Sequence, residues 1–379
     1  MNRRIHLSLA TMGGNELKYV QEAFDTEWVA PLGPNVDHFE NTLSDYLGKN
    51  KEVVALSSGT AAIHLALLQL GVGRDDEVIC QSFTFVASAN PITYLGAKPV
   101  FIDSEPDTWN MDPVLLEEAI QDRIKQTGKK PKAIIFVHLY GLPAKIDEII
   151  TIAKRYDIPT IEDAAEALGS VYKGDKCGTF GDFANLSFNG NKIITTSGGG
   201  ALVCPTKEIA QKTKFFATQA RDDAPHYQHS EIGYNYRMSN VCAGIGRGQM
   251  QMLDKFIARR QAIHAYYQKH LNDCPGITVF TASSADAVSN SWLTCMLIDS
   301  AIAGYTKEDL CKAMDTQNIE TRPLWKPMHL QPVYAKSPFY GNGISESLFS
   351  QGICLPSGNG LSDADLDRVI GVVRGMGRK

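Results

Sequence analysis

The chain has 379 residues, 44% of them hydrophobic, which suits two domains with substantial apolar cores. Its formal charge of −5 excludes a general basic surface of the kind that binds nucleic acid or an anionic membrane. We expect neither a membrane span nor a signal peptide, because no apolar run is long enough and the N-terminal one is broken by His6 and Ser8. Eight single cysteines are typical of reduced thiols in a cytoplasmic protein.

The first two thirds of the chain alternate strand-like and helix-like segments. Strands are expected at 53–56, 78–80, 98–103, 132–141 and 158–163, with helices starting near 59 and covering 113–124 and 144–157. Repeated strand–helix–strand units predict an α/β fold, with a mainly parallel sheet and helices on both of its faces.

The pattern changes toward the C-terminus. One long helix is expected from 240 to 271, capped by Ser239 or Asn240. After it, a strand at 289–299 and a helix at 306–317 suit a smaller α+β domain. We therefore divide the chain into a large domain, 1–255, and a small C-terminal domain, 256–379.

The segment "SSGTAAIHLAL" at 57–67 runs from a strand through a small-residue turn into a helix. Backbone N–H groups at such a helix start form an anion site suited to phosphate, and Gly59 allows close approach. An ordinary strand–helix turn is the alternative interpretation.

The segment "IEDAAEALGS" places Asp163 at the carboxyl end of a predicted parallel strand, where ligands of open α/β sheets bind. Its carboxylate could hold a protonated ring nitrogen of a cofactor, or it could cap the following turn. Glu162 is expected to point away and be structural, whereas Glu166 could face the same pocket.

Lys192 lies in "SFNGNKIITTSGGG", between two strand-like segments and ahead of three glycines. A partly desolvated amine at this place could act as a nucleophile, and Ser187 could donate its hydroxyl to the same phosphate. A single lysine is more often a surface charge. The combination of phosphate turn, acidic strand end and glycine-flanked lysine favours the nucleophile.

These motifs, in this order, resemble those of the sugar-nucleotide aminotransferases of the DegT/StrS group, in the aspartate-aminotransferase-like (fold type I) superfamily of pyridoxal-phosphate enzymes. The resemblance covers nearly the whole chain. The segments that carry it are "WVAPLGPNVDHFE", "SSGTAAIHLAL", "SFTFVASANPITYLGAKPVFID", "HLYGLPAKIDEI", "IEDAAEALGS", "SFNGNKIITTSGGG", "GYNYRMSNVCAGIGRGQM" and "RPLWKPMH".

The resemblance implies that pyridoxal 5'-phosphate is the cofactor. Lys192 would form the internal aldimine and then move protons, and Asp163 would pair with the pyridinium nitrogen. The remaining implied cofactor contacts are Gly59, Thr60 and Ser187 at the phosphate, Phe85 on the ring, Glu166 near the phenolic oxygen, and Asn235 at the phosphate of the neighbouring subunit of a homodimer.

For the sugar nucleotide, the resemblance points to two segments and one arginine. The implied residues are Glu27, Trp28, Val29 and Ala30 in a loop, Glu320, Thr321, Arg322 and His329 near the C-terminal strand, and Arg237 for an anionic group. Arg322 and Lys326 could neutralise a diphosphate. Trp28 and Trp325 could line the pocket or simply pack. No metal site is expected, because His226 and His229 lack a third ligand nearby.

Gly198 departs from the Gly-Glu-Gly-Gly pattern that follows the lysine in many members. The form found here most resembles enzymes of the UDP-N-acetylbacillosamine pathway that aminate C4 of UDP-2-acetamido-2,6-dideoxy-4-keto-glucose with L-glutamate. Another 4-keto sugar linked to dTDP or GDP is the alternative. A sugar dehydratase would carry histidine in place of Lys192, and a non-catalytic relative would not need Lys192, Asp163 and Ser187 intact.

Overall fold

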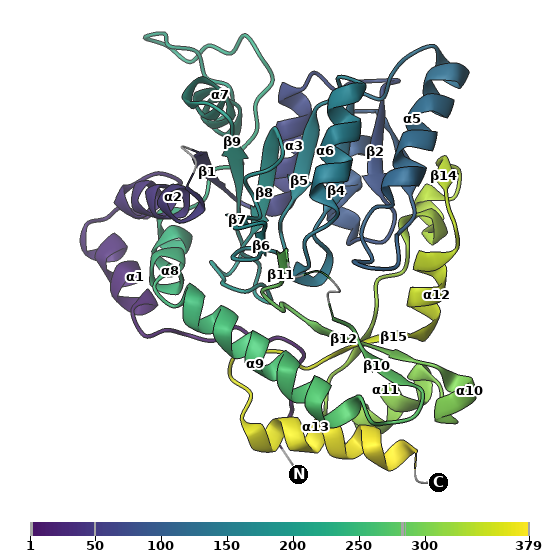
Figure 1. Ribbon diagram of the computed structural model, residues 1–379. Helices are drawn as coiled ribbons and strands as arrows, with labels where there is room; N and C mark the ends of the chain where they lie inside the picture. The colour runs from purple at the N-terminus through teal and green to yellow at the C-terminus, as the bar shows by residue number, and fades with distance from the viewer. Residues whose placement is uncertain (1–2, 49–50, 282–283, 285, 378–379) are drawn as a thin grey trace.

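The computed structural model describes residues 3–48, 51–281, 284 and 286–377. It contains an eight-stranded sheet, in the upper part of Figure 1, and a four-stranded sheet below it. Helix α9 (Leu253–Leu271) runs from the region of the first sheet to the second. Within the described ranges, every helix is too short or too polar to cross a membrane.

The large sheet is mainly parallel, as predicted. Its strands, in spatial order, are β1 (Glu52–Leu56), β9 (Gly200–Cys204), β8 (Phe183–Ser187), β5 (Thr160–Asp163), β4 (Ala133–Val137), β2 (Glu77–Gln81), β3 (Lys98–Ile102) and β14 (Phe339–Tyr340). Only β9 is antiparallel to its neighbours. It reverses because the loop 188–199 contains no helix that would carry the chain across the sheet, so β9 returns alongside β8 in the opposite direction.

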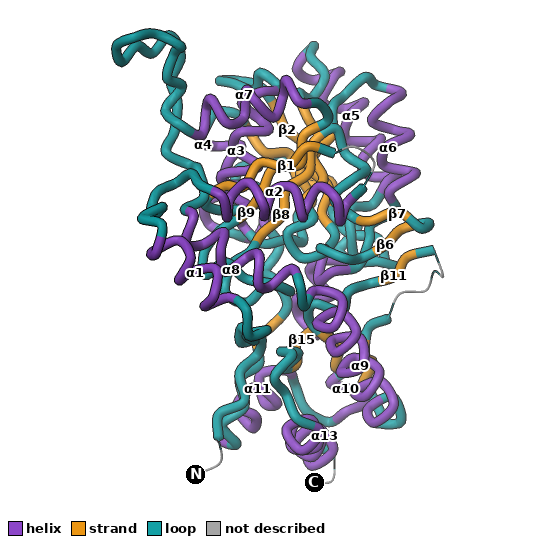
Figure 2. Tube along the Cα trace, turned by 90° about the vertical axis from the view of Figure 1, so that its left-hand side faces the viewer, coloured by secondary structure: helices purple, strands orange, loops and turns teal. Residues whose placement is uncertain are grey.

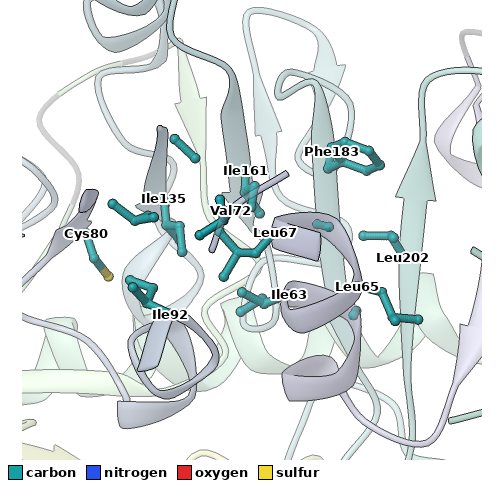
Figure 3. Close-up of a cluster of buried hydrophobic side chains, with 14 of the residues drawn as sticks. Ile63, Leu65, Leu67, Val72, Cys80, Ile92, Ile135, Ile161, Phe183 and Leu202 are labelled. Carbon is teal, nitrogen blue, oxygen red and sulfur yellow. The ribbon is translucent and has the colours of Figure 1, made fainter. Parts of the chain in front are cut away.

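Helices cover both faces of the large sheet, because side chains alternate along each strand and supply two separate cores. The helices of one face are α3 (Gly59–Gln69), α4 (Asn90–Tyr94) and α7 (Lys207–Ala217). Those of the other are α2 (Pro34–Leu47), α5 (Pro113–Thr127), α6 (Ile146–Arg155) and α8 (Asn240–Met250). In Figure 3, Ile63 and Leu67 of α3 lie among strand residues such as Ile135 and Ile161. This packing fixes the start of α3 above the strand ends.

The long helix expected at 240–271 is two helices, so that prediction was wrong. Helix α8 ends at Met250 and α9 begins at Leu253. Ser239 does cap α8, since its hydroxyl accepts from the Cys242 amide. The glycines of α8 bring α1 (Glu16–Asp25) very close: a Cβ at Gly248 would lie 2.7 Å from the Glu16 nitrogen. The break therefore lets α8 pack on α1 while α9 follows another direction.

The small sheet is antiparallel and packs against α9 and two later helices. Its strands, in order, are β10 (Ile277–Val279), β12 (Thr294–Ile298), β15 (Gly352–Leu355) and β13 (Arg322–Pro323). The helices that share its core are α9, α11 (Lys307–Thr316) and α13 (Asp363–Met376). The other short elements are α10 (Ser300–Ala303), α12 (Ile344–Gln351), and a three-stranded sheet of β6 (Val171–Tyr172), β7 (Asp175–Lys176) and β11 (Ala287–Val288). In Figure 2, the helices α9, α11 and α13 lie in the narrow lower part of the molecule.

Two segments join one part of the molecule to the other. Ile5, near the N-terminus, is bridged to Ile319 and buried in the core of the small sheet. The strand β14, from the C-terminal part, pairs with β3 of the large sheet. The division between residues 255 and 256 stays a prediction. Residues from each side of it pack with the other: Ile5 lies in the core of the small sheet, and β14 pairs in the large sheet.

Candidate active site

A cavity of about 260 Å³ opens at the carboxyl ends of β4, β5 and β8. This is the edge at which ligands bind in open α/β sheets. Seven residues that the sequence singled out line it together: Gly59, Thr60, Phe85, Asp163, Glu166, Ser187 and Lys192. They come from four separate segments of the chain, so the fold brings them together from a distance.

The phosphate turn forms one side of the cavity, at the start of α3. The Ser58 hydroxyl caps this helix by accepting from the Ala61 amide at 3.0 Å. Gly59 and Thr60 follow in the first turn, where no carbonyl of the helix can accept from their amides. These N–H groups and the helix dipole suit an anion, and Ser187 lines the same cavity.

The glycines after Lys192 differ in what surrounds them. A Cβ at Gly200 would lie 2.3 Å from the Gly59 nitrogen and from the Ser58 carbonyl carbon, so β9 could not pass beneath the turn. A Cβ at Gly199 would collide with Thr196 and Met238. Gly198 lines the cavity, and nothing lies within 4 Å of the position its Cβ would take. Packing against backbone therefore requires glycine at position 200, side chains crowd position 199, and position 198 leaves open room.

Asp163 ends β5 and is 5% exposed. Its carboxylate accepts from the Ser88 hydroxyl at 2.6 Å, the Asn185 amide at 3.1 Å and the Ala165 backbone amide at 3.1 Å. The Ala165 bond shows that Asp163 also caps the turn after it, as the alternative interpretation expected. Sequence reasoning missed Ser88 and Asn185. Asn185 lies two residues before Ser187 on the same strand face, which is a signal that could have identified it.

Lys192 lies in the loop 188–199 between β8 and β9, with only 11% of its side chain exposed. Its Nζ lies 3.5 Å from Oε1 of Glu166 and 4.2 Å from the centre of the Trp292 ring. A lysine that served only as a surface charge would have its amine in solvent. The structure instead places it in the cavity wall, between a carboxylate and an aromatic face.

Glu166 is buried beside Lys192. Its Oε2 accepts from the Tyr140 backbone amide at 2.7 Å. Burial raises the pKa of Glu166, and the Lys192 cation and the Tyr140 amide offset this only in part. The negative charge of Asp163 raises the same pKa further. Glu166 can therefore hold a proton next to the amine more readily than an exposed glutamate can.

Aromatic rings line another part of the cavity and pack behind it. Tyr140 stacks between Trp292 and Trp325, with ring centres 6.4 Å and 6.0 Å apart. Phe85 lies 5.3 Å from Trp325 and is 49% exposed, so one face of its ring is free for a ligand. Trp325 and Trp292 both line the cavity. Trp292 was not identified from the sequence, because it follows Lys192 by a hundred residues.

Several predicted residues lie outside the cavity. The loop Glu27–Ala30 and Asn235 lie at the surface, and the exposed residues among them are Glu27, Trp28, Val29 and Asn235. Trp28 neither lines the cavity nor packs in a core. Arg237 forms an ion pair with the buried Glu40 and donates to the Ala55 carbonyl at 2.8 Å. This pairing assigns the Arg237 guanidinium a structural contact within the chain rather than a free anion site.

The C-terminal candidates are also away from this cavity. Glu320 accepts from the Leu7 amide at 3.2 Å and pairs with the exposed Arg322 at 2.9 Å. Thr321 contacts the thiol of Cys311. His329 stacks on Phe339, and its Nδ1 lies 2.7 Å from the Ser82 hydroxyl. Their roles toward a substrate stay predictions.

A buried trio of possible metal ligands, His138, Glu162 and Cys177, lies behind the site. The ring of His138 accepts from the Ala144 amide and donates to Glu162 at 2.8 Å. Glu162 also accepts from the amides of residues 178, 180 and 181. These bonds already use the ligand atoms of His138 and Glu162, and they give Glu162 the structural role expected for it.

A model of the DegT/DnrJ/EryC1/StrS aminotransferase family matches residues 10–374. EpsN of Bacillus subtilis, provisionally described as a pyridoxal phosphate-dependent aminotransferase, is 50% identical over 98% of this chain and 96% of its own. The GDP-perosamine synthase of Caulobacter vibrioides is 38% identical over 97% of this chain and 96% of its own. A crystal structure of a family member from Brucella abortus superposes with a TM-score of 0.89 at 31% identity, over 96% of each chain. The chain belongs to the DegT/DnrJ/EryC1/StrS family and is a pyridoxal phosphate-dependent aminotransferase of fold type I.

Proposed function

We propose that this enzyme transfers the amino group of L-glutamate to C4 of a nucleotide-linked 4-keto-6-deoxy sugar, with UDP-2-acetamido-2,6-dideoxy-4-keto-glucose as the first candidate. The observation that carries the proposal is the position of the Lys192 amine. It lies in a cavity that also presents Glu166, Asp163 and a phosphate turn.

The donor set fits pyridoxal phosphate. The amides of Gly59 and Thr60 and the hydroxyl of Ser187 suit its phosphate, and Asp163 is an acceptor placed for its ring nitrogen. Gly200 has no side chain where the turn and β9 touch, so the phosphate turn keeps its shape. When bound, the cofactor supplies an electron sink for the carbon that exchanges its amino group.

Lys192 would attach the cofactor and then act as the base and acid at the reacting carbon. A lysine amine can accept and donate a proton, and Lys192 lies in the cavity wall with 11% of its side chain exposed. The carboxyl of Glu166 lies 3.5 Å from this amine and can take or return its proton. Hydrogen bonds from Ser88, Ala165 and Asn185 hold the Asp163 side chain in its orientation toward the cavity. The aromatic wall excludes water from one side.

Two nucleotides are candidates for the carrier of the sugar. The "NGNKIITTSGGG" segment supports a UDP sugar by resemblance, and the open space at Gly198 leaves room in the cavity wall. The relationship to a GDP-perosamine synthase favours a GDP-linked 4-keto sugar as the second candidate.

We further propose that the enzyme is a homodimer in the cytoplasm, with each subunit completing the site of the other. Exposed apolar side chains gather on α1 and the loop after it: Leu17, Phe24, Trp28, Val29 and Leu32. An apolar surface of this kind supports contact with another copy. Asn235 is exposed and bridged to Thr218, at the base of the loop that follows α7, and it would reach the phosphate of the neighbouring subunit.

The substrate is tested by incubating the purified enzyme with L-glutamate and a panel of UDP, GDP and dTDP 4-keto sugars, and detecting amino sugars by mass spectrometry. The proposal predicts the highest kcat/KM for the UDP-2-acetamido sugar. A preference for a GDP sugar would establish the second candidate, and no amino sugar from any of them would refute the proposed function. Light scattering would show a monomer if the dimer proposal is wrong.

A further inference from the structure

Arg260 lies on α9 with only 1% of its surface exposed. None of its hydrogen bonds to other described residues reaches a carboxylate, and its Nε has no partner there. Burial accordingly lowers the pKa of Arg260 to about 9. A guanidinium buried without an opposite charge is destabilising by itself. We therefore expect the buried Arg260 guanidinium to make specific contacts that offset this cost.

The guanidinium contacts three segments that are far apart in the sequence. One nitrogen donates to the Trp292 carbonyl. The other donates to the Ser8 hydroxyl at 3.0 Å and lies 3.5 Å from the Lys192 carbonyl. Arg260 thus joins the N-terminal segment, the loop that carries Lys192 and the segment before β12.

A second set of bonds ties the same segments to each other. The Asn191 carbonyl accepts from the Ser8 hydroxyl and from the Trp292 indole nitrogen, each at 2.8 Å. The ring of Trp292 in turn lies 4.2 Å from the Lys192 amine. The carbonyls of both Asn191 and Lys192 are therefore held, and the ring that supports the amine is held by the same network.

We propose that Arg260 is a positioning residue for the Lys192 amine, which it fastens through the loop backbone to Trp292 and Ser8. This inference rests on the proposed role of Lys192. The Lys192 amine must stay within bonding distance of the cofactor and of the reacting carbon. Small displacements of such a group lower the reaction rate, so the buried Arg260 would serve the reaction by holding the amine in place. A purely structural arginine would affect folding but not the reactivity of Lys192 in the folded protein.

The test compares Arg260→Met, which keeps a long side chain without donors, with Arg260→Lys, which keeps the charge. Arg259→Gln is the matched control, because Arg259 is the neighbouring residue and its partners among the described residues are the Leu361 carbonyl and Asp363, both away from the Lys192 loop. The cofactor-free proteins are mixed with pyridoxal phosphate. The rate of attachment to Lys192 is followed by absorbance, borohydride reduction and peptide mass spectrometry. Circular dichroism and thermal unfolding report the folded fraction, and kcat and KM for glutamate are measured separately.

We expect Arg260→Met to lower the attachment rate and kcat by about tenfold or more, with KM changed less, since about 1 Å of misplacement can cost up to a hundredfold. Arg260→Lys should recover part of this loss, and Arg259→Gln should match the wild type. A folded Arg260→Met protein with wild-type attachment and kcat would overturn the inference.

If Arg260→Met does not fold, Ser8→Ala and Trp292→Phe test the same network, because each removes one bond to the Asn191 carbonyl. Each should slow attachment severalfold, and the two losses should not add, as expected for residues in one network. Wild-type rates in both would overturn the inference. Failure of the wild-type enzyme to become labelled at Lys192 would instead count against the proposed function.

Discussion

Replacing Gly200 by Ala is a sharp test of the phosphate turn, because the effect of one methyl group can be worked out from the structure. The new Cβ would lie 2.3 Å from the Gly59 nitrogen and 2.6 Å from the Ser58 carbonyl oxygen. Ordinary contacts begin near 3.4 Å, so β9 and the start of α3 must separate by about 1 Å. Both neighbours are backbone atoms, which cannot move aside as the end of a flexible side chain can.

Overpacking of this kind costs about 1–3 kcal/mol in free energy of unfolding. The same displacement moves the amides of Gly59 and Thr60, so we expect pyridoxal phosphate affinity to fall by roughly tenfold to a hundredfold. Gly198→Ala is the matched control, since it adds the same methyl group where nothing lies within 4 Å. Neither glycine has a positive φ, so backbone strain does not enter the comparison.

The assay is a titration of the cofactor-free proteins with pyridoxal phosphate, followed by absorbance, together with thermal unfolding of each variant. Gly200→Ala should show weaker binding and a lower Tm, and Gly198→Ala should resemble the wild type in both. Equal affinity of the two variants would refute the reasoning that places the phosphate at this turn.

Two further predictions concern the carboxylates of the site. Ser88→Ala removes the shortest hydrogen bond to Asp163. A hydrogen bond to a charged group contributes about 1.5–3 kcal/mol, so kcat/KM should fall by at least tenfold, while Ser88→Thr should retain activity. An unchanged kcat/KM in Ser88→Ala would contradict this role. For Glu166, the raised pKa means that the folded protein binds the proton more tightly than the unfolded chain does. The free energy of unfolding of the wild-type protein should therefore fall, relative to that of Glu166→Gln, as the pH rises from the ordinary glutamate range through the raised pKa of Glu166. Thermal unfolding across pH measures this, and parallel profiles of the two proteins would exclude a raised pKa.

The parallel strands and the cavity residues at their ends were predictable, because they follow local patterns. Asp163 ends an apolar strand, and Lys192 lies in a turn between two others, so the sequence alone places both near one edge of the sheet. Their resemblance to a family pattern then identified the chemistry. Glu162 could be assigned to the structural side, since neighbours on a strand point to opposite faces.

Contacts between distant segments were not predictable. Ser88 and Trp292 line the cavity, and Arg260 contacts the Lys192 loop, through tertiary packing that no local pattern indicates. The break between α8 and α9 was missed for a similar reason, because it depends on how closely α1 approaches the glycines of α8. The resemblance implied Arg237 for an anionic group, and its ion pair with Glu40, nearly two hundred residues away, could not be read from the sequence.

The central claim is that Lys192 is the residue to which the cofactor binds covalently. The most direct measurement is borohydride reduction of the purified enzyme with pyridoxal phosphate, followed by digestion and mass spectrometry of the labelled peptide. The account predicts a single label on Lys192, and neither label nor turnover in Lys192→Ala. A label on another lysine, or full activity of the Lys192→Ala variant, would contradict it.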